Sequence, residues 1–356
     1  NISLSFILKG FMKLYYYESK LGNFGDDLNK WLWDELLPDY FDNDESVRFS
    51  GIGTIITDTM PKSNKWIVFS SGVGYGYPPT GFGSPEHWDI MSVRGPLSAH
   101  VLGIDNSKAI TDGAALLSVL PEFRPLQEDQ REGIIFIPHH NALETGRWQE
   151  VCKACNVEFV NPTHDAKYVI QKIRSSKLVL ADAMHAAIIA DAMRVPWVPL
   201  VTSNQINTFK WLDWTQSIQV EYTPLVLGSS SFREAWRNLF LFIYGEKFFV
   251  PGFKKEDAIS YFKFQRKLKS KWWWKNYMEF AKLITYRIPN KTLKIIETKG
   301  DFNWDAKFIG KASNMLQKAA AQKGFLSKND VFEENVRKLL VNIEKLKLQV
   351  HDDEKK

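Results

Sequence analysis

The polar residues best suited to chemistry in this sequence follow short apolar runs, at points where a strand is expected to turn into a helix. They are three histidines, one arginine and three carboxylate or amide residues: Asn23, Asp26, Arg94, Asp112, His139, His140 and His185. In open α/β sheets, ligands bind beyond the carboxyl ends of the strands, where helix N-termini offer free N–H groups to anions. Cations at such junctions predict a site for a small, negatively charged ligand.

Arg94 and His185 have different expected roles at these junctions. Arg94 stands between a predicted strand and a helix that Pro96 begins, where its guanidinium can hold a carboxylate or phosphate through two hydrogen bonds. Pairing with a structural carboxylate is the alternative. His185 lies in the first turn of a predicted helix that Asp182 caps, where the helix dipole disfavours a protonated imidazole unless an anion is bound.

The remaining candidates also allow two interpretations each. His139 and His140 end a predicted strand, and adjacent side chains of an extended chain point to opposite faces. We therefore expect only one of the two to face the site, and the sequence favours neither. Asp26 and Asp112 suit either acid–base chemistry or capping of the helices that follow them.

Several other chemistries are not supported by the motifs. Gly72-Val73-Gly74 lacks the third glycine of a dinucleotide fingerprint, because Tyr77 stands there. No phosphate-binding loop of the Walker type and no G-x-S-x-G motif occurs. Cys152 and Cys155 form a C-x-x-C inside a predicted helix without a second pair for zinc, so we expect ordinary thiols. We expect no metal and no cofactor.

The elements that must position these residues alternate between strands and helices through residue 250, which is typical of an α/β fold with parallel sheets. The predicted strands are short apolar runs at 14–17, 66–69, 90–93, 109–110, 133–137, 158–160, 178–180 and 197–201. A charged, proline-containing loop over 121–131 divides them into two halves. We predict two Rossmann-like domains that face a cleft, 1–127 and 128–245, followed by a helical, basic and aromatic extension over 246–356.

Composition restricts the class of protein further. The chain of 356 residues is 44% hydrophobic and 24% charged, which is the balance of a globular protein and not of a disordered or fibrous one. Two cysteines exclude a disulfide scaffold. No apolar run is long enough for a spanning helix, and the first ten residues lack the charged start and cleavage site of a secretory signal.

The net charge of +5 is unevenly distributed. Residues 251–300 hold 13 Lys or Arg and 4 acidic residues, interleaved with aromatics that include Trp272, Trp273 and Trp274. This composition predicts contact with an anionic membrane surface. Packing of the aromatics on the body and binding of single-stranded nucleic acid are the alternatives, and we expect no nucleic-acid partner. The stretch 330–347 predicts an amphipathic helix that docks on the body.

Five short motifs in order resemble the polysaccharide pyruvyltransferase family, in particular its exopolysaccharide ketal pyruvyltransferases of the xanthan and succinoglycan type. They are Asn23-Phe24-Gly25-Asp26-Asp27-Leu28-Asn29, Arg94-Gly95-Pro96, Thr111-Asp112-Gly113, Ile137-Pro138-His139-His140 and Ala183-Met184-His185 with the helix through Ala192. The likeness spans about residues 12–225. Many members carry an arginine two residues before the histidine that matches His185, but this chain has Ala183 there. Either another cation serves the donor, or this branch of the family binds the donor differently.

The resemblance implies a GT-B-like transferase that uses phosphoenolpyruvate as co-substrate. The pyruvyl group is expected to pass to two hydroxyls of one sugar in a lipid-linked oligosaccharide or polysaccharide, giving a cyclic ketal and phosphate. The resemblance also implies that the enzyme acts in the cytoplasm, at the inner face of the membrane. The implied site residues are Arg94, His185 and Asp112 for the donor, Asn23, Asp26 and Asn29 for the acceptor, and His185, His139 or His140, and Asp26 for acid–base catalysis.

Two other functions are compatible with the same sequence. A GT-B glycosyltransferase that uses a nucleotide-sugar would share the architecture and the cationic junctions. A non-catalytic protein that binds glycans or membranes would keep the fold without turnover. Stabilisation by phosphoenolpyruvate rather than by a nucleotide diphosphate separates the first from our prediction, and phosphate release separates the second.

Overall fold

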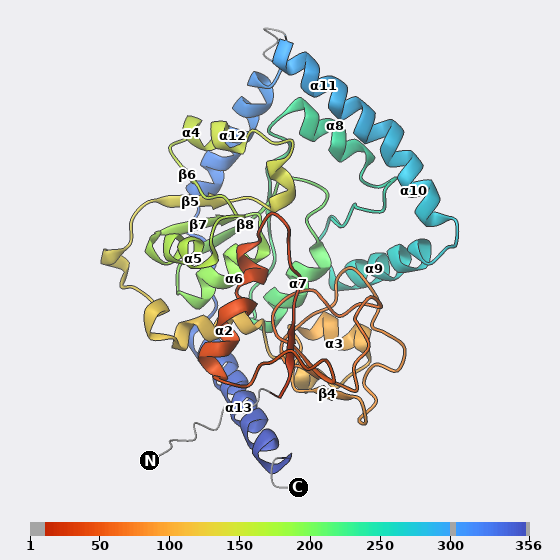
Figure 1. The fold of residues 1–356 in the computed structure, drawn as a ribbon. Helices are drawn as coiled ribbons and strands as arrows, with labels where there is room; N and C mark the ends of the chain where they lie inside the picture. The colour runs from red at the N-terminus through yellow and green to blue at the C-terminus, as the bar shows by residue number, and fades with distance from the viewer. Residues whose placement is uncertain (1–10, 300–303, 354–356) are drawn as a thin grey trace, which may run out of the picture.

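A computed structural model describes residues 11–299 and 304–353. The first ten residues, for which no secretory signal is expected, and Gly300 at the end of the predicted membrane segment lie outside the described residues. The chain forms two parallel sheets surrounded by helices, with the first sheet in the lower part of Figure 1 and the second above it. The expected mixed α/β fold with parallel sheets is confirmed.

The first sheet has four parallel strands in the order β1-β2-β3-β4. Its elements are β1 (Lys13–Tyr15), α1 (Phe24–Asp27), α2 (Asn29–Leu36), β2 (Val47–Ser50), β3 (Lys65–Val68), β4 (Trp88–Ile90), α3 (Pro96–Leu102) and the 3-10 helix η2 (Gly113–Val119). The predicted strand at 109–110 is wrong, because Ala109 makes only an isolated bridge to Val93. A 3-10 turn at Asn106–Lys108 ends directly before Ala109, so the chain extends too briefly to form a ladder.

The second sheet has five parallel strands in the order β6-β5-β7-β8-β9. Its elements are β5 (Ile134–Ile137), the 3-10 helix η5 (His140–Leu143), α4 (Trp148–Ala154), β6 (Glu158–Phe159), α5 (Ala166–Ser175), β7 (Leu178–Ala181), α6 (Met184–Ala192), β8 (Trp197–Val201), α7 (Thr208–Ser217), β9 (Leu225–Val226) and α8 (Phe232–Phe240). Strands β7 and β8 are buried along their whole length, as expected for continuous apolar runs covered on both faces.

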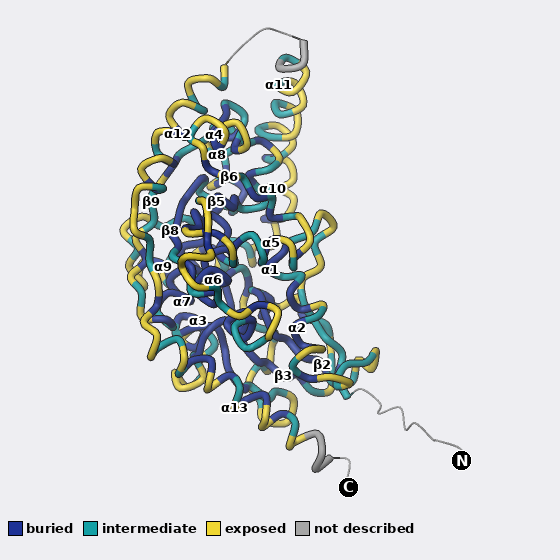
Figure 2. Tube along the Cα trace, turned by 90° about the vertical axis from the view of Figure 1, so that its left-hand side faces the viewer, coloured by how far each residue is buried: buried dark blue, intermediate teal, exposed yellow. Residues whose placement is uncertain are grey.

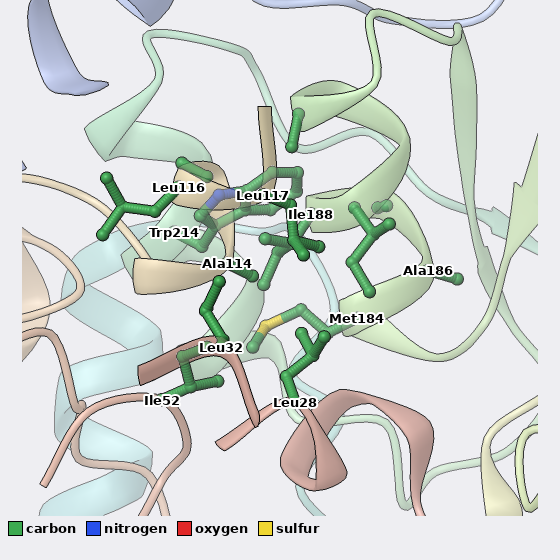
Figure 3. Close-up of a cluster of buried hydrophobic side chains, with 14 of the residues drawn as sticks. Leu28, Leu32, Ile52, Ala114, Leu116, Leu117, Met184, Ala186, Ile188 and Trp214 are labelled. Carbon is green, nitrogen blue, oxygen red and sulfur yellow. The ribbon is translucent and has the colours of Figure 1, made fainter. Parts of the chain in front are cut away.

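One hydrophobic core continues from the first half of the chain into the second. Figure 3 shows the junction, where side chains of η2 such as Leu117 lie against Met184 and Ile188 of α6, with Leu28 and Ile52 close by. Trp214 of α7 completes this cluster. Helix α7 therefore packs between the two halves, although it follows the second sheet in the sequence.

Helices form the C-terminal part of the chain. They are α9 (Lys255–Lys269), α10 (Trp274–Lys282), a π-helix η6 (Leu283–Arg287), α11 (Ile288–Lys299), α12 (Ala306–Ala320) and α13 (Asn329–Asp353). Leu339, Ile343 and Leu346 of α13 are buried, and the Asn342 side chain donates to the Met91 carbonyl at 3.3 Å. The predicted amphipathic helix thus docks on the first half, as the blue helix in Figure 1 shows. No helix in the described ranges has the length and apolarity to cross a membrane.

Candidate active site

A cavity of about 480 Å³ opens where the two halves meet. Its lining comes from both halves and includes Asn23, Asp26, Thr54, Tyr75, His139, His140, Ala183, His185, Lys210 and Arg237. Five of the residues predicted from the sequence are therefore brought together. Arg94, Asn29 and Asp112 do not line the cavity.

Asp26 is the carboxylate that the start of α1 presents to the cavity. The Asn23 side-chain amide donates to Asp26 Oδ2 at 2.5 Å. Burial raises the pKa of Asp26 from 3.8 to about 7, although the positive charge of Lys210 opposes this shift. Gly25 allows α1 to approach His185 closely, because a Cβ at this position would lie 2.0 Å from His185 Nδ1. The carboxyl of Asp26 is thus poised to gain or lose a proton near neutral pH.

The expectation that only one of His139 and His140 faces the site is wrong, because both line the cavity. The extended chain ends at Ile137, and His139 then caps the short 3-10 helix η5, so the two rings lie together, with centroids 4.3 Å apart and planes tilted by 31°. The Asn141 N–H donates to His139 Nδ1 at 3.3 Å. This contact leaves the proton of neutral His139 on Nε2, which can donate to a ligand.

Asp182 fixes the position of this histidine turn. Its Oδ2 accepts the His139 N–H at 2.8 Å and the Thr202 hydroxyl at 2.8 Å, and its Oδ1 accepts the Thr202 N–H at 2.9 Å. The predicted role of Asp182 as the cap of α6 is wrong, since Ala183 occupies that position without a side-chain bond. Asp182 instead ties together the ends of β5, β7 and β8.

His185 and Asp112 face each other at the edge of the cavity. Their closest atoms, His185 Nε2 and Asp112 Oδ2, are 3.9 Å apart, and both are buried without a hydrogen bond. Asp112 Oδ1 caps η2 by accepting the Ala114 N–H at 3.0 Å, so capping accounts for one of its oxygens. Burial, with the charges of Lys210 and Arg94, lowers the pKa of His185 to about 3. The imidazole is therefore neutral near pH 7 and can accept a hydrogen bond.

Arg94 is fully buried, and its guanidinium N–H groups form hydrogen bonds with acceptors of the protein itself. Its guanidinium donates to Asp213 Oδ2 at 2.9 Å, to Thr54 Oγ1 at 2.8 Å and to the Val73 carbonyl at 2.9 Å. The alternative interpretation, a structural ion pair, describes this geometry. Asn29 is similarly occupied, because its amide bonds the Asp26 and Ile52 carbonyls and accepts from Trp33 and the Ile52 N–H.

Replacing Arg94 by alanine is expected to destabilise the fold. Removing one member of a buried ion pair leaves the Asp213 carboxylate without its countercharge and typically costs about 3–5 kcal/mol. Chemical denaturation should show this loss in the free energy of unfolding, and the double variant Arg94→Met with Asp213→Leu should regain part of it. A stable Arg94→Ala protein that has lost only donor affinity would contradict this assignment.

Lys210 and Arg237 are the cations of the cavity, and the sequence analysis missed both. Lys210 of α7 lies with its Nζ 3.3 Å from the Tyr75 hydroxyl and 4.9 Å from the ring centroid. Arg237 of α8 donates to the Asn141 carbonyl at 3.2 Å. The charge of Lys210 lowers the pKa values of Asp26, Asp112, His139, His140 and His185. The one sequence signal that could have indicated Lys210 is its place between two aromatic residues, Phe209 and Trp211.

The described residues contain no cluster of three or more His, Cys, Asp or Glu side chains able to hold a metal ion. Cys152 lies in α4, as predicted, and Cys155 ends it. Burial raises the pKa of both thiols, which therefore remain protonated and unreactive.

The fold and cavity define an α/β protein with an acid–base site next to two cations. A family model described as polysaccharide pyruvyl transferase matches residues 25–204. The chain is 41% identical over 247 residues to the succinoglycan biosynthesis protein ExoV of Rhizobium meliloti (strain 1021), a match that covers 69% of this chain and 75% of that protein. The chain therefore belongs to the polysaccharide pyruvyl transferase family and is a transferase enzyme. No solved structure matches it significantly.

Proposed function

We propose that this enzyme transfers the pyruvyl group of phosphoenolpyruvate onto two hydroxyls of one sugar in an exopolysaccharide unit and releases phosphate. The observation that carries the proposal is a carboxyl of pKa about 7, Asp26, in one cavity with Lys210 and Arg237. A donor with a carboxylate and a phosphate needs such cations, and protonation of its enol carbon needs such an acid.

The donor is held between the two cations. Lys210 lines the cavity and supplies a charged hydrogen-bond donor, so we propose that it is the cation that serves the donor in place of an arginine at position 183. Arg237 acts on the side of the two adjacent histidines, because its charge lowers the pKa values of His139 and His140. His139 donates through Nε2–H, so it binds the phosphate in its neutral form.

Chemistry begins with the proton of Asp26. Its transfer to the methylene carbon of phosphoenolpyruvate creates an oxocarbenium-like centre at the neighbouring carbon, which the first sugar hydroxyl attacks. Phosphate then leaves, and the second hydroxyl closes the ketal ring. One hydroxyl proton ends in the new methyl group by way of Asp26, and the other leaves with phosphate. Burial thus favours Asp26 over His185 as the acid, because it raises the pKa of Asp26 to about 7 and keeps His185 neutral.

The acceptor enters beside α1. Asn23 lies next to Asp26, and Tyr17 at the cavity rim is 56% exposed, as a stacking surface for a sugar would be. We propose that the sugar belongs to a lipid-linked oligosaccharide or polysaccharide, and that the enzyme works in the cytoplasm at the inner face of the membrane. The GT-B-like arrangement of two Rossmann-like domains, 1–127 and 128–245, remains part of this proposal.

Phosphate release tests the proposed function. The purified enzyme should release phosphate from phosphoenolpyruvate only in the presence of a suitable terminal mannoside, galactoside or glucoside, and the product should gain the mass of a pyruvyl ketal. Phosphoenolpyruvate should also raise the melting temperature, by the mass-action stabilisation of any bound ligand. Stabilisation by a nucleotide diphosphate instead would favour the glycosyltransferase, and no phosphate release with any glycan would favour the non-catalytic alternative.

A further inference from the structure

A stripe of apolar side chains faces solvent along α10, η6 and α11. Successive members are three, four or seven residues apart, and this spacing places them on one helix face. They are Trp273, Tyr277, Phe280, Ile284, Ile288 and Ile295. Phe280, Ile284 and Ile288 are 65%, 50% and 55% exposed. Trp272, at the start of the stripe, is 89% exposed. We call these residues the docking stripe.

The opposite side of the same helices is fixed to the body, so the docking stripe is held in place. Trp274 and Ala281 are buried there. Pro289 has no N–H to donate to the Thr285 carbonyl, and the Trp236 indole of α8 donates to that carbonyl at 2.9 Å instead. Figure 1 shows α8 alongside α11, and Figure 2 shows exposed segments along the outer turns of α11.

Charge accompanies the apolar residues of this segment. Residues 271–296 hold six Lys or Arg and one acidic residue, Glu279. Arg287 pairs with Glu279 at 2.9 Å and Lys282 with Glu246, whereas the other four, all lysines, have no ion pair within the described residues. An apolar face rimmed by uncompensated cations is complementary to an anionic lipid surface, where the apolar side chains enter the interface and the cations meet the headgroups. A second copy of this chain would bring the same cations together and repel.

The preceding helix of the basic segment behaves differently. Ala258 and Phe262 of α9 are buried, and Phe262 stacks on Phe209 of α7 at 4.9 Å. Packing therefore accounts for α9, whereas Phe280, Ile284 and Ile288 of the docking stripe are at least half exposed. The membrane segment predicted over 251–300 thus narrows to residues 272–295.

We propose that the docking stripe is a membrane-binding face that seats the enzyme on anionic lipid beside its active site. Tyr286, next to the stripe, stacks under Arg237 at 5.2 Å and donates to Glu144 at 2.6 Å. Because Arg237 lines the cavity, the same helices contact both the lipid surface and the donor side of the site. This inference rests on the proposed function in one respect only: the proposed function explains why the enzyme would meet a lipid-linked acceptor at the membrane surface.

Vesicle binding by the full chain tests the proposal without donor or acceptor. The wild type should sediment with vesicles of phosphatidylglycerol and phosphatidylethanolamine and only weakly with phosphatidylcholine vesicles. The triple variant Phe280→Ser, Ile284→Ser, Ile288→Ser should lose about tenfold or more in affinity for the anionic vesicles. Leu348→Ser is the matched control, because Leu348 is 65% exposed on α13, away from the stripe, and its loss should change nothing.

Three other outcomes of these binding experiments would contradict the membrane-binding face. Unchanged sedimentation of the triple variant would overturn the proposal, as would a wild-type dimer that only this variant converts to a monomer. Tighter binding of single-stranded nucleic acid than of anionic vesicles by the wild type would also overturn it. Phosphate release with a soluble acceptor should be the same for the triple variant and the wild type, so that a failure of docking and a failure of the proposed transfer are told apart.

Discussion

Replacing Lys210 by alanine should lower kcat/KM for phosphoenolpyruvate by about 10²–10³-fold while the protein remains folded. The side chain supplies the central positive charge of the cavity, and loss of a charge-assisted bond to a desolvated anion typically costs about 2–5 kcal/mol. Steady-state phosphate release at varied donor concentration measures the effect. Circular dichroism and thermal unfolding verify the fold.

A shift in the pH profile separates this role from a structural one. The charge of Lys210 lowers the pKa of Asp26, so its removal should raise that pKa and move the alkaline limb of the rate profile to higher pH. Lys210→Arg should recover part of the donor affinity because the charge returns. Lys172→Ala is a surface control, since Lys172 pairs with Glu158 at 2.6 Å on the surface of α5 and does not line the cavity. An unshifted profile with normal donor affinity would exclude Lys210 from the site.

The sequence predicts those site residues that directly follow parallel strands. Carboxyl ends of neighbouring parallel strands meet at one edge of a sheet, so polar residues directly after apolar runs come together without further information. His139 and His185 follow β5 and β7, which are adjacent, and both line the cavity. Asp26 joins them from the other half, beyond β1.

The part that the sequence does not predict depends on contacts between distant segments. Arg94 and Asp213 are 119 residues apart, and their burial together docks α7 against the first half, which in turn brings Lys210 into the cavity. No periodicity encodes that pairing. The protonation states are also tertiary properties, because burial both raises the pKa of Asp26 and lowers that of His185. The carboxyl, and not the imidazole, is therefore the group that carries a proton near neutral pH.

The domain boundaries at 127 and 245 remain predictions, because they too depend on contacts between distant segments. A loop with prolines and charges marks 121–131, and 3-10 turns at Pro121–Phe123 and Glu128–Gln130 lie within it. The hydrophobic core nevertheless continues across the two halves. Hydrophobic periodicity locates elements along the chain, whereas separation into domains depends on which elements share a core.

Replacing Asp26 by asparagine should lower kcat by about 10²–10⁴-fold, the usual contribution of a positioned acid or base. The amide keeps the shape of the side chain but cannot deliver a proton to the donor. In the wild type, activity should fall as pH rises through about 7, where the carboxyl loses its proton. This limb should be absent from the residual activity of the variant. Asp34→Asn is the control, because Asp34 is exposed on α2 and does not line the cavity.

The same substitution should make the protein more stable at alkaline pH. The carboxyl of Asp26 has a pKa of about 7 in the folded state against an ordinary 3.8, so between these values the folded protein keeps a proton that the unfolded chain has lost. The free energy of unfolding therefore decreases as pH rises from 3.8 to about 7. The decrease is at most about 4 kcal/mol, and water in the cavity makes it smaller because it screens the charge. Asparagine removes this cost. Thermal unfolding at about pH 8 should show a higher Tm for Asp26→Asn than for the wild type, with the difference vanishing near pH 4. Equal Tm values at both pH values, or a less stable variant at the higher one, would mean that Asp26 is ionised in the folded enzyme and cannot be its acid.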